Sequence, residues 1–336
     1  MINTLIVDDS ALARDILRDF LEEDGGFNII GEAADGEEGA EKILSMNPDL
    51  VTLDLEMPKM NGLQVIETVL KKVSVPIVVI SSHDTAKIAY EATIKGALEF
   101  YSKEIFASNL NPQKRKEIYE TLKRISGIKS HKNIPVNPPQ IKLPDKRTID
   151  AIVMASSTGG PKALANFFTL LGAGPLPPII LVQHNSPGFD ESFAQWLGTF
   201  TPLKIKIAQE NEKPQPGSVY IAQTGLHLQL RKNAAGLIML YNDGSEESNQ
   251  KPAADVLFRT AAESLGQSVI SAVFTGMGSD GAAGTAAIRN AGGITIAQDE
   301  ETSLIYGMPQ AAVRTGCVDM VLPLDKIPGE IIRLVR

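Results

Sequence analysis

Residues 2–23, INTLIVDDSALARDILRDFLEE, set the pattern of the first part of the chain. A short run of apolar and β-branched residues ends at two aspartates, and residues 11–23 then place apolar residues at helical spacing. A strand followed by an amphipathic helix is the repeating unit of a parallel sheet with both faces covered. Further strand-like runs lie at 28–33, 49–53, 75–80 and 97–101, with helical patterns at 62–72 and about 108–125. We therefore predict a five-stranded α/β sandwich of flavodoxin-like type over residues 1–126.

A second α/β domain is expected after a proline-rich segment. Residues 127–147 include IPVNPPQIKLPDK, which has no apolar period and is typical of a semi-rigid linker. From 148 to 336 the alternation resumes and predicts a second doubly wound, mostly parallel α/β domain. Residues 226–241, LHLQLRKNAAGLIMLY, predict instead a small antiparallel hairpin. The strands expected here lie at 149–154, 179–183, 203–207, 218–222, 269–274 and 293–297, with helices at 161–171 and 282–291.

Composition limits the classes of function that are open to the chain. Its 336 residues carry a net charge of −8, which argues against a protein whose main role is to bind nucleic acid. Cys317 is the only cysteine, so a disulfide within one chain and a cysteine metal cluster are excluded. The N-terminal MINTLIVDD has no signal-peptide pattern, and apolar runs such as PIVVI (76–80) are only of strand length. We expect no insertion into a membrane and a cytoplasmic location.

Acidic residues follow the predicted strands of the first domain. Asp8 and Asp9 follow the first strand and Asp54 the third, and carboxyl ends of parallel strands share one edge of the sheet. Three carboxylates at one edge repel each other unless a hard cation neutralises them, and Mg²⁺ prefers such oxygen ligands. Ser81 and Lys103 follow the fourth and fifth strands and could hold phosphoryl oxygens. A structural interpretation also exists, in which the first two aspartates cap a helix and the third ends a strand.

These residues lie in motifs that resemble the receiver domains of two-component response regulators. The resemblance implies that Asp54 accepts a phosphoryl group and that Mg²⁺ is held by the three aspartates with the Glu56 carbonyl. It also implies that Ser81 and Phe100 are switch residues. Glu104 follows Lys103 where the family commonly has proline, so the local loop should differ. The matching stretches are VDDS (7–10), LDLEMPKMNG (53–62), VISS (79–82) and FYSK (100–103).

A serine lies at the first strand-to-helix turn of the second domain, in IDAIVMASSTGGPKAL (149–164). Backbone N–H groups at a helix start can stabilise an oxyanion, but a serine nucleophile also needs a base. His184 follows the strand IILVQ and is therefore expected at the same sheet edge. Asp280, in FTGMGSDG (274–281), comes from a third strand end and can orient the imidazole. Of the other three histidines, His83 is in a loop of the first domain, His131 is in the linker and His227 is in the expected hairpin.

The second domain resembles the chemotaxis protein-glutamate methylesterases, the CheB family, over nearly all of 148–325. The resemblance implies that Ser157 rather than Ser156 is the nucleophile, with His184 as general base and Asp280 as its partner. It also implies oxyanion or substrate roles for Thr158 and for the Met277 N–H. The stretches that carry it are SSTGGP, VQHNSPGF, FTGMGSDGAAG and AQDEETSLIYGMP.

The combined resemblance implies hydrolysis of glutamate methyl esters on the cytoplasmic domains of methylated chemoreceptors, for adaptation in chemotaxis. Deamidation of certain receptor glutamines is implied as a second activity. A chemotaxis histidine kinase is the implied phosphodonor, and the unphosphorylated receiver is expected to cover the hydrolase cleft. The ester step itself requires no metal or organic cofactor. A location at chemoreceptor clusters follows from the same resemblance.

Several stretches leave alternatives open. Ser157 and Asp280 could each serve only to cap the helix that follows. Ala155-Ser156 and Asn185-Ser186 differ from the residues common in the family, which could alter substrate fit. Lys251-Pro252 and residues 255–259 resemble a family stretch near the substrate cleft, and a structural role suits them equally well.

A different class of enzyme is suggested by one glycine-rich motif. Gly276, Gly278 and Gly281 form G-x-G-x-x-G after a strand, and a second strand ends at Asp299, as in dinucleotide-binding oxidoreductases. The motif lies in the middle of the domain rather than in its first βα unit, and it leaves SSTGG and QH unexplained. A DNA-binding output domain is a weaker alternative, because no helix-turn-helix pattern is evident.

Overall fold

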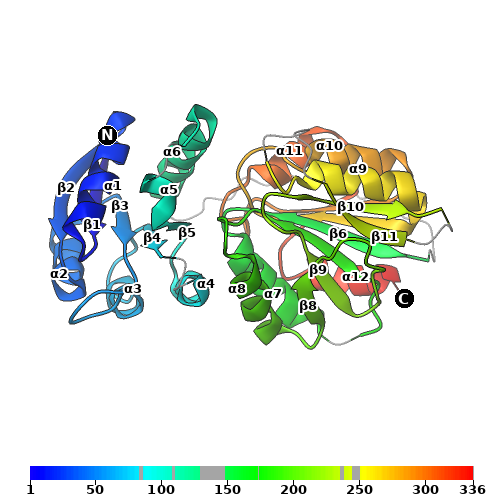
Figure 1. Ribbon diagram of the computed structural model, residues 1–336, viewed down its shortest axis with the longest axis horizontal. Helices are drawn as coiled ribbons and strands as arrows, with labels where there is room; N and C mark the ends of the chain where they lie inside the picture. Colours follow the sequence, from blue (N-terminus) through cyan, green and yellow to red (C-terminus); the bar gives the residue numbers. More distant parts are fainter. Residues whose placement is uncertain are drawn as a thin grey trace. The chain divides into compact units, whose positions relative to one another are not determined.

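The computed structural model describes residues 1–82, 86–107, 110–128, 148–172, 174–234, 238–243 and 250–335. The chain divides into two compact units, Met1–His131 and Lys132–Arg336, and each is described by itself (Figure 1). Most of the segment predicted to be a linker, residues 129–147, lies outside the described residues, as do His83 and His131. Within the described residues, every helix is too short or too polar to cross a membrane.

The first unit is built on a five-stranded parallel sheet in the order β2-β1-β3-β4-β5. From β1 the chain passes to β2, on one side of β1, and then to β3, on the other side of β1. The carboxyl ends of β1 and β3 therefore flank the point where the winding reverses, which is where such sheets bind ligands. The predicted flavodoxin-like arrangement is confirmed. The strands are β1 Ile2–Val7, β2 Phe27–Ala33, β3 Leu50–Leu53, β4 Ile77–Ser81 and β5 Glu99–Ser102.

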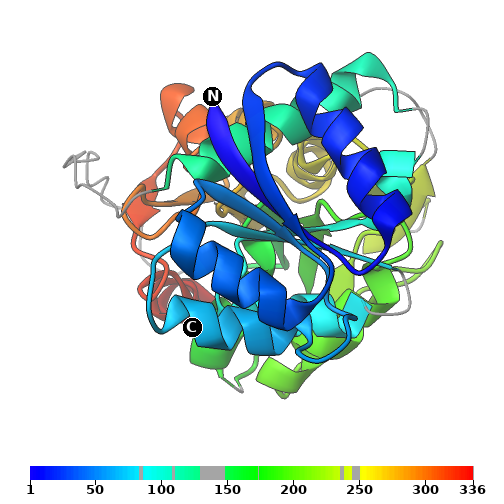
Figure 2. The same ribbon diagram turned by 90° about the vertical axis from the view of Figure 1, so that its left-hand side faces the viewer.

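Helices cover both faces of this sheet (Figure 2). α1 begins where the Ser10 side chain accepts a hydrogen bond from the Ala13 N–H, and it buries Leu17 and Phe20 toward the sheet. Phe20 packs against Tyr119 of α6 on the same face, with ring centroids 4.7 Å apart. A short helix, α5, was not predicted, and α6 starts later than the expected residue 108. The helices are α1 Ala11–Glu23, α2 Gly36–Met46, α3 Gly62–Leu70, α4 Ala86–Lys95, α5 Lys103–Ala107 and α6 Pro112–Ser126.

The second unit contains a seven-stranded sheet in the order β14-β13-β12-β6-β7-β9-β8, and all of its paired strands are parallel. From β6 the chain moves to β7 on one side, and it later returns to β12 on the other. The carboxyl ends of β6 and β12 thus form the second reversal point. β14 was not predicted. The strands are β6 Ala151–Ser156, β7 Ile179–Gln183, β8 Lys204–Ile207, β9 Ser218–Ile221, β12 Val269–Val273, β13 Ile294–Gln298 and β14 Met320–Leu322.

Helices lie on both faces of the second sheet as well (Figure 1). They are α7 Gly160–Leu171, α8 Asp190–Leu197, α9 Ala254–Leu265, α10 Ala282–Asn290, α11 Met308–Arg314 and α12 Ile327–Val335, with 3₁₀ turns at Gly198–Phe200 and Gly266–Ser268. The predicted antiparallel hairpin is confirmed as β10 His227–Lys232 and β11 Ile238–Asp243. It is bound to α9, because Thr260 Oγ1 accepts the Leu230 N–H at 3.2 Å. Leu228 and Leu230 join the buried core beneath α9.

Candidate functional site

Three neighbouring strands bring polar side chains to one edge of the second sheet. Ser157 follows β6 directly, His184 follows β7, and Asp280 lies in the loop between β12 and α10. β6 pairs with both β7 and β12, so the three positions meet at the reversal point of the winding. The structure therefore places the three residues expected to form a catalytic triad at the end of adjacent strands.

The two adjacent serines of the turn have different environments. Ser156 is the last residue of β6 and is fully buried, and its hydroxyl donates to Gln183 Oε1 at 2.6 Å. Ser157 lies beyond the strand and is partly exposed. Its backbone N–H is bonded to the Thr275 carbonyl at 3.0 Å, which fixes the main chain and leaves the side chain accessible. Accessibility thus favours Ser157 over Ser156 as a nucleophile.

His184 and Asp280 are in direct contact, with the imidazole Nε2 2.9 Å from Asp280 Oδ2. Both side chains are largely enclosed, at 13% and 10% exposure. A carboxylate accepts hydrogen bonds, so Nε2 carries the proton and Nδ1 is left as the basic nitrogen. Among the interactions of the described residues there is no hydrogen bond between Ser157 Oγ and His184. Such bonds often form only in the substrate complex.

Asp280 is held by the start of α9 as well as by His184. Oδ2 also accepts the Ala254 N–H at 2.7 Å, and Oδ1 accepts the N–H groups of Asp255 and Gly281 at 2.9 and 3.0 Å. Burial alone would raise the pKa of Asp280, but the bonds from His184 and the backbone outweigh it and keep this pKa below its usual value. The carboxylate is therefore fixed in its ionised form. Lys251-Pro252 and residues 255–259, which the sequence left without a definite role, lie just before and within the first turns of the helix that holds it.

The glycine-rich loop after β12 packs closely on the serine turn. A Cβ atom at Gly276 would lie 2.8 Å from the Ser157 Cβ, so only glycine fits without displacement. The Gly276 carbonyl accepts the N–H groups of Gly307 and Met308 at 3.1 and 2.8 Å. Met277 follows Gly276 in this loop. Thr158 follows Ser157 in the turn and is buried.

Polar residues that the sequence analysis did not single out hold this site together. Gln183 and Gln298 end largely apolar strands and are buried. The Gln183 amide donates to the carbonyls of Ser157 and His184, and Gln298 Oε1 accepts the Thr275 N–H. A buried glutamine at the end of a largely apolar strand, as in IILVQ and ITIAQ, is the signal that could have revealed them.

The dinucleotide interpretation finds no support in this geometry. The backbone of Gly276 is already bonded to the segment at 305–308, including a bond from its N–H to the Ile305 carbonyl at 3.0 Å. Asp299 Oδ1 accepts hydrogen bonds from the Thr302 N–H and hydroxyl, so it closes a local turn. A pyrophosphate-binding loop needs free backbone N–H groups, and a ribose-binding acid needs an available carboxylate.

The first unit has an acidic centre at its own reversal point. Asp8, Asp9 and Asp54 each bring a carboxylate oxygen within 4.8 Å of the others. Lys103 Nζ lies 2.8 Å from Asp8 Oδ2 and 2.8 Å from Asp54 Oδ2. Two of the carboxylates are buried, so bulk solvent screens their charges poorly. An all-oxygen cluster of this kind suits Mg²⁺, and the residues present fit such an ion. Glu56 lies two residues after Asp54 in the same loop.

Asp54 is chemically distinct within this cluster. Burial is the main influence and raises the pKa of Asp54, the charge of Asp8 adds to it, and Lys103 opposes it only in part. Ser81 ends β4 with no exposed surface and lies beside Ser102 of β5. Phe100 is buried, and its ring meets that of Tyr90 edge-on at 4.8 Å. Ser81 and Phe100 thus lie on β4 and β5, which follow β3 in the order of the sheet, and Lys103 comes directly after β5.

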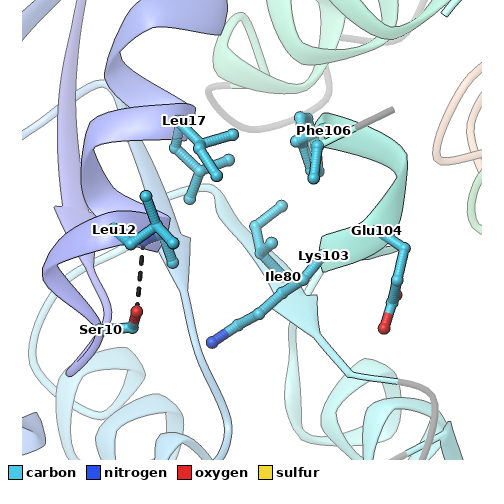
Figure 3. Close-up of a pocket in the computed structure, with 10 residues that line it drawn as sticks. Ser10, Leu12, Leu17, Ile80, Lys103, Glu104 and Phe106 are labelled. Atoms are coloured by element: carbon cyan, nitrogen blue, oxygen red, sulfur yellow. Dashed lines mark hydrogen bonds between the residues drawn. The ribbon is translucent and has the colours of Figure 1, made fainter. Parts of the chain in front are cut away.

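An apolar pocket of about 220 Å³ adjoins the acidic centre, between α1 and α5. Figure 3 shows Leu12 and Leu17 facing Phe106 across it, with the Lys103 nitrogen at its edge near Ser10. Leu12 is 69% exposed, although it is a large apolar residue at the start of a helix. The lysine that binds Asp54 therefore also borders an apolar surface. Glu104, which stands where proline was expected, lines the pocket and accepts a hydrogen bond from Ser102 Oγ.

Comparison with known proteins accounts for both units. Residues 152–331 match the family model described as CheB methylesterase, and residues 4–113 match the response regulator receiver domain. The chain belongs to the CheB methylesterase family. The order of receiver and methylesterase domains in the chain is the one expected from its motifs.

Relatives of this family match the chain over its whole length. A protein of Pyrococcus abyssi named protein-glutamate methylesterase/protein-glutamine glutaminase is 37% identical over 347 residues, covering 100% of this chain and 94% of the relative. A protein of the same name from Thermotoga maritima is 33% identical and covers 100% of this chain and 99% of the relative. The crystal structure of the Thermotoga maritima CheB methylesterase catalytic domain superimposes with a TM-score of 0.54 and 37% identity. It covers 56% of this chain and 100% of that domain.

Proposed function

We propose that the chain hydrolyses the methyl esters of glutamate side chains on chemoreceptor proteins, under the control of phosphorylation in its receiver domain. The observation that carries this proposal is the His184–Asp280 pair beside the accessible Ser157, in a chain of the CheB methylesterase family. Deamidation of receptor glutamines is a second activity, supported by the names of the relatives. The domain limits that go with this proposal are 1–126 for the receiver, 127–147 for the linker and 148–336 for the methylesterase.

The proposed ester reaction is acyl transfer through Ser157. His184 Nδ1 takes the hydroxyl proton as Ser157 Oγ attacks the ester carbonyl, and Asp280 stabilises the imidazolium that forms. Backbone N–H groups at Thr158 and Met277 bind the oxyanion. The proton then passes to the departing methoxide, and methanol leaves. Water, activated by His184, hydrolyses the acyl-enzyme to release a glutamate carboxylate and the free serine. In deamidation, ammonia leaves in place of methanol.

In the receiver, Asp54 is the proposed phosphoryl acceptor and a chemotaxis histidine kinase the proposed donor. Asp8, Asp9 and Asp54, with the Glu56 carbonyl, would hold Mg²⁺, which supplies positive charge to offset that of the carboxylates and the phosphoryl group. Lys103 is placed to bind a phosphoryl oxygen, since its ammonium already contacts Asp54. Ser81 and Phe100 are the proposed switch residues. We place the reaction in the cytoplasm, at chemoreceptor clusters.

The test is methanol release from a methylated chemoreceptor fragment. Wild type is compared with Ser157→Ala and with Ser156→Ala as a matched neighbour, each with and without a small phosphodonor and Mg²⁺. Release that requires Ser157, survives at Ser156→Ala and rises with phosphodonor supports the proposal. Equal release from Ser157→Ala and wild type would overturn the assignment of the nucleophile.

Control by the receiver is tested separately with a truncated chain. Removal of residues 1–147 should raise basal methanol release, because the unphosphorylated receiver is proposed to cover the hydrolase cleft. Such control needs the interaction between the two domains to differ by only a few kcal/mol between the phosphorylated and unphosphorylated states. Asp54→Asn in the full chain should abolish the response to phosphodonor while leaving basal release intact. A truncated protein no faster than the unphosphorylated full chain would contradict steric control.

A further inference from the structure

Helices α9 and α10 begin beside each other, and neither start has a side-chain cap of its own. The N-cap residues are Ala253 for α9 and Gly281 for α10, and neither provides a side-chain hydrogen bond to its own helix. The first N–H groups of a helix have no partners within the helix and need acceptors from elsewhere. In this protein the side-chain acceptors come from the opposite helix start.

The two acceptors are aspartates that cross over between the helices. Asp280, just before α10, accepts the N–H groups of Ala254 and Asp255 in the first turn of α9 at 2.7 and 2.9 Å. Asp255 of α9 in turn accepts the N–H of Gly284 in the first turn of α10 through Oδ1, at 2.7 Å. Each helix is thus capped by a carboxylate of the other.

The distance between the two helix starts is set by Gly284. A Cβ atom there would lie 2.5 Å from Phe258 Cβ and 3.1 Å from Asp255 Cα, so a larger residue would separate the helices. The close approach is what allows the Asp255 carboxylate to reach the α10 backbone. It also sets the position of the α9 N–H groups relative to the loop that carries Asp280.

We propose that Asp255 is a positioning residue of the active site, which aligns Asp280 with His184 by joining the starts of α9 and α10. This inference rests on the proposed function, because it assigns Asp255 a part in the same ester reaction. Within the part of the chain that the structure describes, the hydrogen-bond partners of Asp280 other than His184 and Gly281 come from α9. A shift of α9 relative to α10 therefore moves the carboxylate that holds the imidazole. Misplacement of a catalytic group by about 1 Å can lower a rate by about 100-fold.

The experiment compares three variants of the full chain in the methanol-release assay. Asp255→Ala removes the acceptor for Gly284, and we expect kcat to fall by at least about tenfold with KM within about twofold of wild type. Asp255→Asn keeps an oxygen at the same position and should retain kcat within about threefold. Glu263→Ala removes an exposed acid later on α9 and should leave kcat unchanged.

A second measurement separates positioning from stability. Proton NMR of the imidazole N–H of His184, assigned with His184→Ala, reports its hydrogen bond to Asp280 at a temperature where circular dichroism shows every variant folded. We expect the resonance to move or broaden in Asp255→Ala and to be retained in Asp255→Asn. An unchanged resonance and kcat in Asp255→Ala, or an equal loss in Asp255→Asn and Asp255→Ala, would overturn the inference. A wild-type rate equal to that of Ser157→Ala would instead overturn the proposed function.

Discussion

Thr275→Val should destabilise the second unit, although the two side chains have nearly the same shape. Thr275 is buried, and its hydroxyl joins the nucleophile turn to the segment before α11. It donates to the Thr158 carbonyl at 3.0 Å and accepts the Ile305 N–H at 3.0 Å. Valine would leave a buried carbonyl and a buried N–H without this partner. At about 1–3 kcal/mol for each of these two groups, we expect a loss of about 2–6 kcal/mol.

The matched control is Thr275→Ser, which keeps the hydroxyl and removes only a buried methyl group. Its cost should be about 1 kcal/mol, so the two variants should differ by at least that amount. For a unit of this size, the larger loss should lower the thermal midpoint by about 4–24 °C. We also expect a lower kcat in Thr275→Val, because the Thr158 carbonyl belongs to the turn that carries Ser157.

Fluorescence gives a direct assay of this prediction. Trp196 is the only tryptophan of the chain, and it is buried in α8 of the second unit. Urea unfolding followed at this residue therefore reports the second unit without a contribution from the first. Midpoints that coincide for Thr275→Val and Thr275→Ser would refute the reasoning, because the hydroxyl would then contribute nothing.

Three further predictions concern charge and close packing. Asp54→Asn should raise the thermal midpoint of the first unit by a few degrees. The pKa of Asp54 is raised, so its ionised carboxylate destabilises the fold at neutral pH. A lower midpoint by circular dichroism would contradict this. The pKa of Asp280 is lower in the folded state than in the unfolded chain, so its ionised carboxylate stabilises the fold above about pH 4. This stabilisation is lost as the pH falls through the pKa of the folded state, so Asp280→Asn should flatten the acid-unfolding curve below pH 4. Gly276→Ala places a Cβ 2.8 Å from the Ser157 Cβ and should cost about 1–3 kcal/mol and lower methanol release. Gly174→Ala, with no atom within 4 Å, should change neither quantity.

The strands were predictable because parallel sheets leave a strong signal in sequence. Each central strand is buried on both faces, so it reads as a continuous apolar run between polar turns. Two of the elements that were not predicted are short. β14 has three residues, and α5 follows directly from β5 without an intervening loop, so neither is long enough to show a period. The helix expected from about residue 108 begins instead at Pro112, after the Asn111 cap.

The polar residues at strand ends were predictable for a related reason, but the bonds among them were not. Ser157, His184 and Asp280 could be placed at one sheet edge because chain order and parallel strands determine which ends are neighbours. Thr275 and Asp255 act through partners more than twenty residues away in the sequence, at Ile305 and Gly284. Such bonds depend on the separation of packed elements, to which a single sequence gives no guide.

Each proposed chemical centre is complete within one unit of the chain. The acidic cluster and Lys103 fall within Met1–His131, whereas the serine, histidine and aspartate of the ester reaction fall within Lys132–Arg336. Neither proposed centre includes a residue of the other unit. Gene fusion could therefore have joined two working modules without rebuilding either one. Communication between them then has to evolve at their surfaces, where substitutions are tolerated more readily than at the reacting atoms. In such a protein the dependence of activity on phosphorylation can change or be lost while the catalytic activity is retained.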